Sequence, residues 1–180
     1  MKLWTALSNA FAGWLMILRG EPGWRERFTL TAAGFTTALA VFVFMTFLAV
    51  AITSASIGMP SLFGVIAAMF ALALPLTSLV VVLLGTRLAL GSTEPTLPVM
   101  VPGTYALTAF LLAEGLLAML GGPVVMMAWL GLGYALYRLV RSAMSWNVAI
   151  SAGFAVLTVV LLVAMRLALY MLSGAAAPAI

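Results

Sequence analysis

Residues 29–53, with the sequence TLTAAGFTTALAVFVFMTFLAVAIT, decide the class of this protein because they include no charged side chain. A helix of roughly 20 apolar residues crosses a hydrocarbon core about 30 Å thick, so this stretch is long enough to span a membrane. The whole chain agrees, since 66% of its residues are hydrophobic and 7% are charged. A soluble domain is roughly half apolar and about a quarter charged. We therefore expect the chain to be surrounded by lipid.

Four more apolar stretches follow the first one. They are residues 61–86, 103–120, 123–139 and 147–172. Residues that break helices gather between them, in segments 54–60 and 88–102 and at the turn of Gly121, Gly122 and Pro123. The sequence therefore predicts an all-α fold: a single integral membrane domain, residues 1–180, containing a five-helix transmembrane bundle.

The basic residues fall on one side of this layout. That side holds Lys2, Arg19, Arg25, Arg27, Arg87, Arg138 and Arg141. The loops predicted on the other side, 54–60 and 121–122, carry no charge. Cytoplasmic loops of membrane proteins keep an excess of Lys and Arg. We expect a multi-pass protein of a bacterial inner (plasma) membrane, with a cytoplasmic N-terminus and a periplasmic or extracellular C-terminus.

The first 20 residues have a different pattern from the spans. Large apolar side chains recur at spacings of three and four residues, at Trp4, Leu7, Phe11, Trp14 and Leu18. This spacing forms one stripe along a helix, and it predicts an amphipathic helix that lies in the membrane interface. The opposite face, expected toward water, holds Lys2, Thr5, Asn9 and Gly13. The alternative is that the stripe packs on the bundle or on a partner subunit.

Aromatic rings and arginines collect at the level of the lipid headgroups. The predicted interfacial anchors are Trp4, Trp14, Trp24, Arg25, Arg27 and Trp146. Membrane lipids are therefore expected partners.

Two charged residues, Glu114 and Arg166, lie well inside predicted spans. Both spans run outward, and each residue sits roughly 10 Å below the outer end of its helix, given a rise of about 1.5 Å per residue. A charge in a bilayer is costly and is usually paired or functional. We predict an intramembrane ion pair. The alternatives are a proton or cation site at Glu114 tuned by Arg166, or an Arg166 that extends to the outer headgroups by itself.

The second span contains two further candidate features. Pro75 removes a backbone hydrogen bond and is a possible hinge, with the hydroxyls of Thr77 and Ser78 near the freed carbonyl. Gly64 and Ala68 are small residues four positions apart, a spacing that lets another helix approach closely. Packing within the chain and contact with another copy explain that spacing equally well.

The composition also limits the chemistry. The chain has no His, Cys or Asp and only four Glu, which excludes disulfides, thiolate or imidazole zinc sites and His-based triads. It contains no glycine-rich phosphate loop and no nucleophile elbow. We expect no enzymatic activity, no catalytic residue, no metal or cofactor, and no nucleic-acid partner.

The layout of an interfacial helix followed by five spans resembles that of the Yip family of small membrane proteins. The most similar stretch is residues 129–149, where Tyr134, Ala135 and Leu136 lead through Arg138 and Arg141 to a short loop and a new span. The resemblance implies a non-enzymatic membrane protein that acts through partners or on membrane organisation.

These features together favour a non-catalytic accessory, assembly or scaffold subunit that contacts membrane lipids and either other membrane proteins or further copies of itself. The alternative is a small oligomeric transporter or channel whose pathway includes the region of Glu114 and Arg166.

Overall fold

The computed structural model describes residues 2–57 and 62–175, and within these ranges the chain is helical and forms no strand. Its α-helices are α1 (Lys2–Arg19), α2 (Ala32–Ile57), α3 (Leu62–Leu90), α4 (Leu97–Leu120), α5 (Val125–Ala143) and α6 (Val148–Ala175). Two short 3-10 helices, η1 (Trp24–Arg27) and η2 (Gly122–Val124), complete the fold. Of the predicted loop 54–60, the first four residues extend α2 and residues 58–60 lie outside the described ranges.

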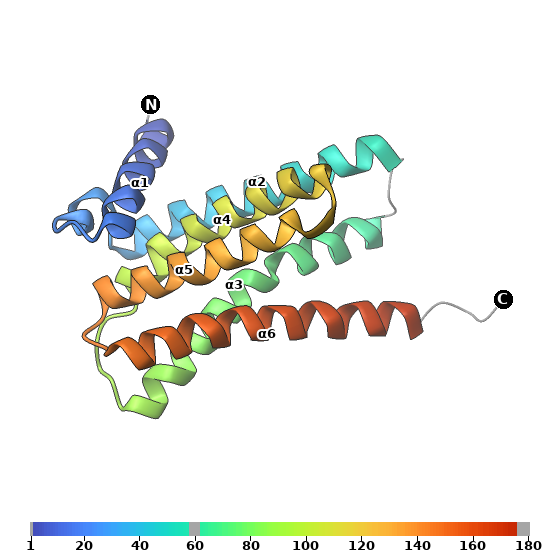
Figure 1. The fold of residues 1–180 in the computed structure, drawn as a ribbon. Coiled ribbons are helices and arrows are strands. Elements are labelled where there is room, and N and C mark those ends of the chain that lie inside the picture. The colour runs from blue at the N-terminus through green and yellow to red at the C-terminus, as the bar shows by residue number, and fades with distance from the viewer. Residues whose placement is uncertain (1, 58–61, 176–180) are drawn as a thin grey trace.

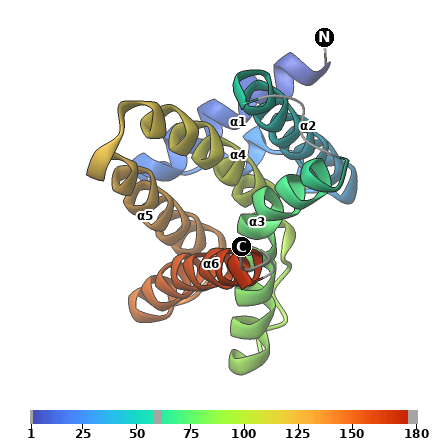
Figure 2. The ribbon, with the colours of Figure 1, turned by 90° about the vertical axis from the view of Figure 1, so that its right-hand side faces the viewer.

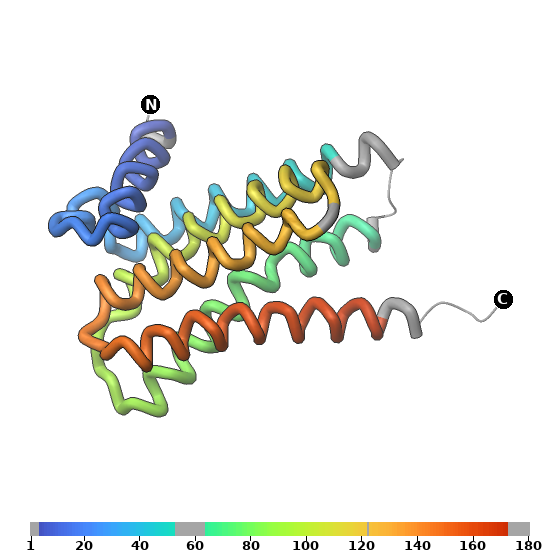
Figure 3. The backbone as a smooth tube through the Cα atoms, in the orientation of Figure 1, coloured from blue at the N-terminus to red at the C-terminus, as the bar shows by residue number. Residues whose placement is uncertain are grey.

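Helices α2 to α6 run back and forth along one axis, whereas α1 lies across it at one end (Figure 1). We call the end where α2, α4 and α6 begin the proximal end, and the end where these helices finish the distal end. Figure 2, which views the bundle from its distal end, shows α1 crossing behind α4. The tube in Figure 3 shows the same alternation of direction. A helix transverse to the bundle is the orientation expected for the amphipathic segment.

Four of the described helices contain a stretch long and apolar enough to cross a membrane. These stretches are Ala32–Ile52, Gly64–Leu90, Leu97–Leu120 and Val148–Leu172. Helix α5 is not among them, because Arg138 and Arg141 make its last turns polar. It nevertheless runs beside α4 from the distal to the proximal end (Figure 1).

Helix α4 begins at Leu97, six residues before the predicted start at residue 103. Proline needs no hydrogen-bond partner in the first turn of a helix, so Pro98 is compatible with a helix start. Pro102 lies one turn further and is also helical and buried. Pro98 and Pro102 of segment 88–102 therefore belong to α4, and only Pro95 stays in the loop before it.

The core lies where α4 packs between α2 and α5, and α6 covers α3 and α5. Fully buried leucines from four helices meet there, at Leu79, Leu83, Leu107, Leu136, Leu139 and Leu162. Gly103 lets the side chain of Leu79 on α3 pack directly against α4, because a Cβ atom at this position would lie 2.8 Å from Cδ2 of Leu79.

Candidate functional site

The structure brings Glu114 of α4 and Arg166 of α6 together. Nη1 of Arg166 donates to Oε1 of Glu114 at 2.5 Å, and Nη2 donates to Oε2 at 2.9 Å. This two-bond geometry is the strongest arrangement available to a guanidinium and a carboxylate. It links the distal half of α4 to the distal half of α6.

Two aromatic rings surround the guanidinium of Arg166. Its Cζ lies 5.0 Å from the ring centroid of Trp129 and 5.8 Å from that of Phe110, and the two rings meet edge to face. Cations are attracted to aromatic faces at these distances. The side chains of Arg166 and Glu114 are 28% and 17% exposed, respectively. The pair thus compensates both charges within a mostly apolar setting and joins α4, α5 and α6.

Pro75 is buried within α3, and the helix continues through it. The hydroxyl of Ser78 donates to the carbonyl of Pro75 at 2.8 Å, and that of Thr77 donates to the carbonyl of Ala73 at 3.3 Å. Proline frees the carbonyl four residues earlier, which belongs to Ala71. The expectation that these hydroxyls satisfy the freed carbonyl is therefore wrong. Each hydroxyl instead bonds to a backbone carbonyl three or four residues earlier in the same helix, as Ser and Thr side chains do in helices.

Gly64 and Ala68 lie in the distal half of α3, and both are half-buried. Phe70, two residues beyond Ala68, is 60% exposed. The distal half of α3 thus offers a mixed surface of small and large apolar residues.

Helix α1 is attached to the bundle by one buried face. Ala10, Gly13 and Ile17 are buried, and the aromatic ring of Phe28 occupies the space in which a side chain at Gly13 would lie. The expectation that Gly13 faces water is therefore wrong. The neighbouring face holds Trp4 and Phe11, which are 78% and 69% exposed. Helix α1 thus combines a protein-facing side with an open apolar side.

Side-chain hydrogen bonds add to this attachment. Nε1 of Trp14 donates to the carbonyl of Pro102 at 3.0 Å, and Nη2 of Arg138 donates to the carbonyl of Ile17 at 3.2 Å. The last carbonyls of a helix have no partner inside the helix, so the second bond caps the end of α1. Arg25 caps α5 in the same way, through a 2.8 Å bond to the carbonyl of Ala143.

Two of the predicted interfacial anchors are core residues. Trp24 is 5% exposed and packs edge to face on Phe28, while Trp146 is 6% exposed and packs on Phe154. Their indoles stabilise the proximal end from inside and do not reach its surface. Arg25 and Arg27 are exposed on η1.

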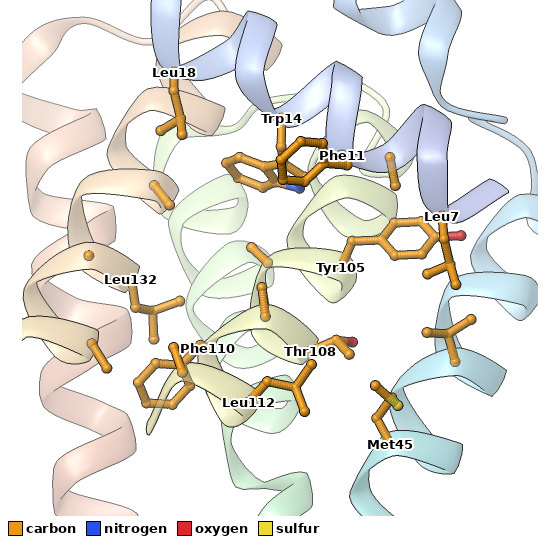
Figure 4. Close-up of a pocket in the computed structure, with 18 of the residues that line it drawn as sticks. Leu7, Phe11, Trp14, Leu18, Met45, Tyr105, Thr108, Phe110, Leu112 and Leu132 are labelled. Atoms are coloured by element: carbon orange, nitrogen blue, oxygen red, sulfur yellow. The ribbon is translucent and has the colours of Figure 1, made fainter. Parts of the chain in front are cut away.

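An apolar groove lies beneath α1, with a volume of about 1060 Å³ (Figure 4). Helix α1 forms its roof, α4 its floor, and α2 and α5 its two walls. Figure 4 shows Leu7, Phe11, Trp14 and Leu18 extending from the roof toward Thr108 and Leu112 of the floor. The stripe recognised in the sequence therefore overhangs a concave surface. The pattern gave no sign of the groove itself, because its walls come from helices far apart in the sequence.

A polar link at the proximal end was also not recognisable from the sequence. The carboxylate of Glu94 accepts hydrogen bonds from the backbone N–H of Ser145, at 3.3 and 3.4 Å, and from its hydroxyl. It ties the α3–α4 loop to the α5–α6 loop. Within the described part of the chain, no group of three or more His, Cys, Asp or Glu side chains is placed to hold a metal ion.

The chain matches no protein-family model, no curated protein and no solved structure. The resemblance to the Yip family therefore stays a prediction, and the function has to be argued from the geometry.

Proposed function

We propose that this protein is a non-catalytic integral membrane protein, an accessory, assembly or scaffold subunit that acts through protein and lipid contacts. The proposal rests on the contacts that the charged side chains make. Arg25, Arg138 and Arg141 donate to backbone carbonyls of their own chain, and Glu114 and Arg166 bind each other. Charges that hold helices together are not free for chemistry. What the molecule offers to others is apolar surface, and the groove is a concave part of it.

We also propose that α5 is a fifth span. Helices α4 and α6 run in the same direction, so the segment joining them has to return across the same thickness (Figure 1). Its 19 residues span about 28 Å at 1.5 Å per residue, close to the hydrocarbon thickness. Arg138 and Arg141 lie in its last two turns, from which their long side chains can extend to the headgroups at the proximal end. The α5 side chains that are buried against α4 and α6 do not face lipid, so α5 can cross the membrane with a lower hydropathy than the other spans.

The proposed orientation places the proximal end in the cytoplasm. Arg19 ends α1, Arg25 and Arg27 lie on η1, Arg87 is in the last turn of α3, and Arg138 and Arg141 are in the last turns of α5. All these segments are at the proximal end (Figure 1), which therefore satisfies the positive-inside rule. The transverse α1 then lies in the cytoplasmic interface and α6 ends outside. Because bacterial outer-membrane proteins are typically β-barrels, a helical bundle favours the inner membrane.

The test of the accessory function is purification of the tagged, full chain from its native membranes in a mild detergent. We expect other membrane proteins to co-elute at a fixed stoichiometry that persists through a second, orthogonal column. Elution alone or only as a self-complex would contradict the accessory role.

The alternative, a small transporter or channel, has one observation in its favour. The Arg166 side chain of the intramembrane pair is 28% exposed. A charged pair that is not fully sealed is what an ion or proton pathway requires. Flux through proteoliposomes that is lost in Glu114→Gln, at unchanged protein stability, would favour this function over the accessory one.

A further inference from the structure

We propose that the groove beneath α1 binds an anionic phospholipid of the cytoplasmic leaflet, with its acyl chains in the groove and its headgroup at Arg27. This inference rests on the proposed orientation and on the proposed role of the groove as a contact surface. It adds the identity of the ligand and a site for its charge.

The headgroup site is a second, smaller cavity of about 390 Å³ next to the groove. It lies between α1, η1, the start of α2 and α4, and its polar side chains are Asn9, Arg27, Thr29, Thr37 and Tyr105. None of the described residues that line it carries a carboxylate. Among the described residues Arg27 has no ion-pair partner, in contrast to Arg19, which lies 3.7 Å from Glu21. The hydroxyl of Thr37 already donates to the carbonyl of Ala33. The cavity therefore presents a free positive charge beside the amide of Asn9 and the hydroxyls of Thr29 and Tyr105, which suits a phosphate.

Tyr105 connects the two cavities because it lines both of them. Figure 4 shows its ring extending beneath α1 toward Leu7. The adjacent residues Ala6 and Leu7 of α1 line the headgroup cavity and the groove, respectively. One molecule with a polar, negatively charged end and a long apolar part can therefore occupy both cavities at once.

The shape of the groove favours acyl chains over a helix of a partner protein. An α-helix with its side chains is about 10–12 Å across and runs straight through the hydrocarbon core. Here α1 crosses over the groove at its proximal end (Figures 1 and 4) and obstructs such a path. Acyl chains are narrow and flexible, and they end at the headgroup level, where α1 and Arg27 lie. The groove is also at the upper limit of the roughly 300–1000 Å³ typical of small-ligand sites, which leaves room for more than one chain.

The full-length protein is purified in a mild detergent. Two quantities are then measured: its stabilisation by added lipid, and the lipid that it retains in native mass spectrometry. The probes are phosphatidylglycerol, which is anionic, and phosphatidylcholine, which is zwitterionic with the same chains. We expect the wild-type protein to be stabilised by both lipids and to retain phosphatidylglycerol in preference, at one molecule per chain.

Four substitutions locate the binding site. Arg27→Gln should lower the preference for phosphatidylglycerol by about fivefold, since one basic contact is removed. Arg19→Gln makes the same change of charge outside the cavity and should keep the preference. Gly131→Leu fills the groove from α5, where nothing lies within 4 Å of an added Cβ, and should abolish retention of both lipids. Gly153→Leu, equally unobstructed but on α6 and outside the groove, should bind like the wild-type protein.

Equal retention of the two lipids by the wild-type protein would overturn the inference. So would an Arg19→Gln protein that loses as much preference as Arg27→Gln, because the effect would then be general surface charge. A partner polypeptide cross-linked within the groove, with no lipid retained, would overturn it as well. A lipid-deficient variant that still co-purifies with its partners would leave the accessory function standing, so the two proposals can fail separately.

Discussion

The guanidinium of Arg166 on α6 binds both carboxylate oxygens of Glu114 on α4, at 2.5 and 2.9 Å, while the rings of Trp129 and Phe110 lie against it. The pair joins the distal halves of these two helices. Few other contacts join α4 directly to α6 there, so these two side chains carry much of the connection between the helices.

Removing one charge of the pair should destabilise the bundle. In Glu114→Gln the guanidinium of Arg166 remains in an apolar setting without a counter-charge. We expect a loss of about 1–3 kcal/mol, somewhat below the cost of breaking a fully buried pair because both side chains keep some exposure. Thermal unfolding in detergent measures it.

The double variant Glu114→Gln, Arg166→Gln is the control. It removes the uncompensated charge and should recover part of the lost stability. Unfolding of Glu114→Gln at the wild-type temperature would show that the pair is not structural.

The pairing of Glu114 with Arg166 can be predicted from the sequence for two reasons. The rise per residue of a helix gives both side chains a similar depth in the membrane, and lipid offers neither charge another partner. The contacts of Arg166 with Trp129 and Phe110 cannot be predicted in this way. They depend on how three helices are rotated about their own axes, and helices that are apolar on every side leave that rotation open.

The errors at the proximal end have a related cause. Aromatic residues near arginines are typical of the membrane interface, which led to the prediction that Trp24 and Trp146 are anchors there. Both are buried, because η1 folds back beneath α1 and Trp146 packs on Phe154. Gly13 was predicted to face water because it lies on the side of the helix opposite the apolar stripe. Its lack of a side chain instead allows Phe28 to pack against α1.

Enlarging Gly13 should therefore detach α1. A leucine at this position would displace the ring of Phe28, whereas Ser8→Leu adds the same side chain on an exposed face of α1 and serves as the control. We expect Gly13→Leu to be cleaved by trypsin after Arg19, Arg25 and Arg27 several times faster than the control. Equal cleavage rates would show that α1 is not held by this contact.

The proposed topology predicts the labelling of single cysteines, and no native cysteine interferes. Thr93 is exposed in the α3–α4 loop, Pro123 is exposed between α4 and α5, and Ser145 is exposed after α5. Thr93→Cys and Ser145→Cys should react with an impermeant thiol reagent only from the cytoplasmic side, and Pro123→Cys only from outside. Labelling of Pro123→Cys and Ser145→Cys from the same side would rule out α5 as a span.

The carboxylate of Glu94 should contribute to stability although it lies outside the membrane spans. It accepts hydrogen bonds from Ser145 and joins two proximal loops that are separated by two helices. A hydrogen bond to a charged group contributes about 1.5–3 kcal/mol, and the exposure of Ser145 lowers this contribution, so we expect Glu94→Gln to lose about 1 kcal/mol. Glu26→Gln makes the same change on exposed η1, where it disrupts no such link, and should stay within about 0.5 kcal/mol of the wild-type protein. If both variants unfold together with the wild-type protein, the two loops are held by the packing of Trp146 and its neighbours and not by this carboxylate.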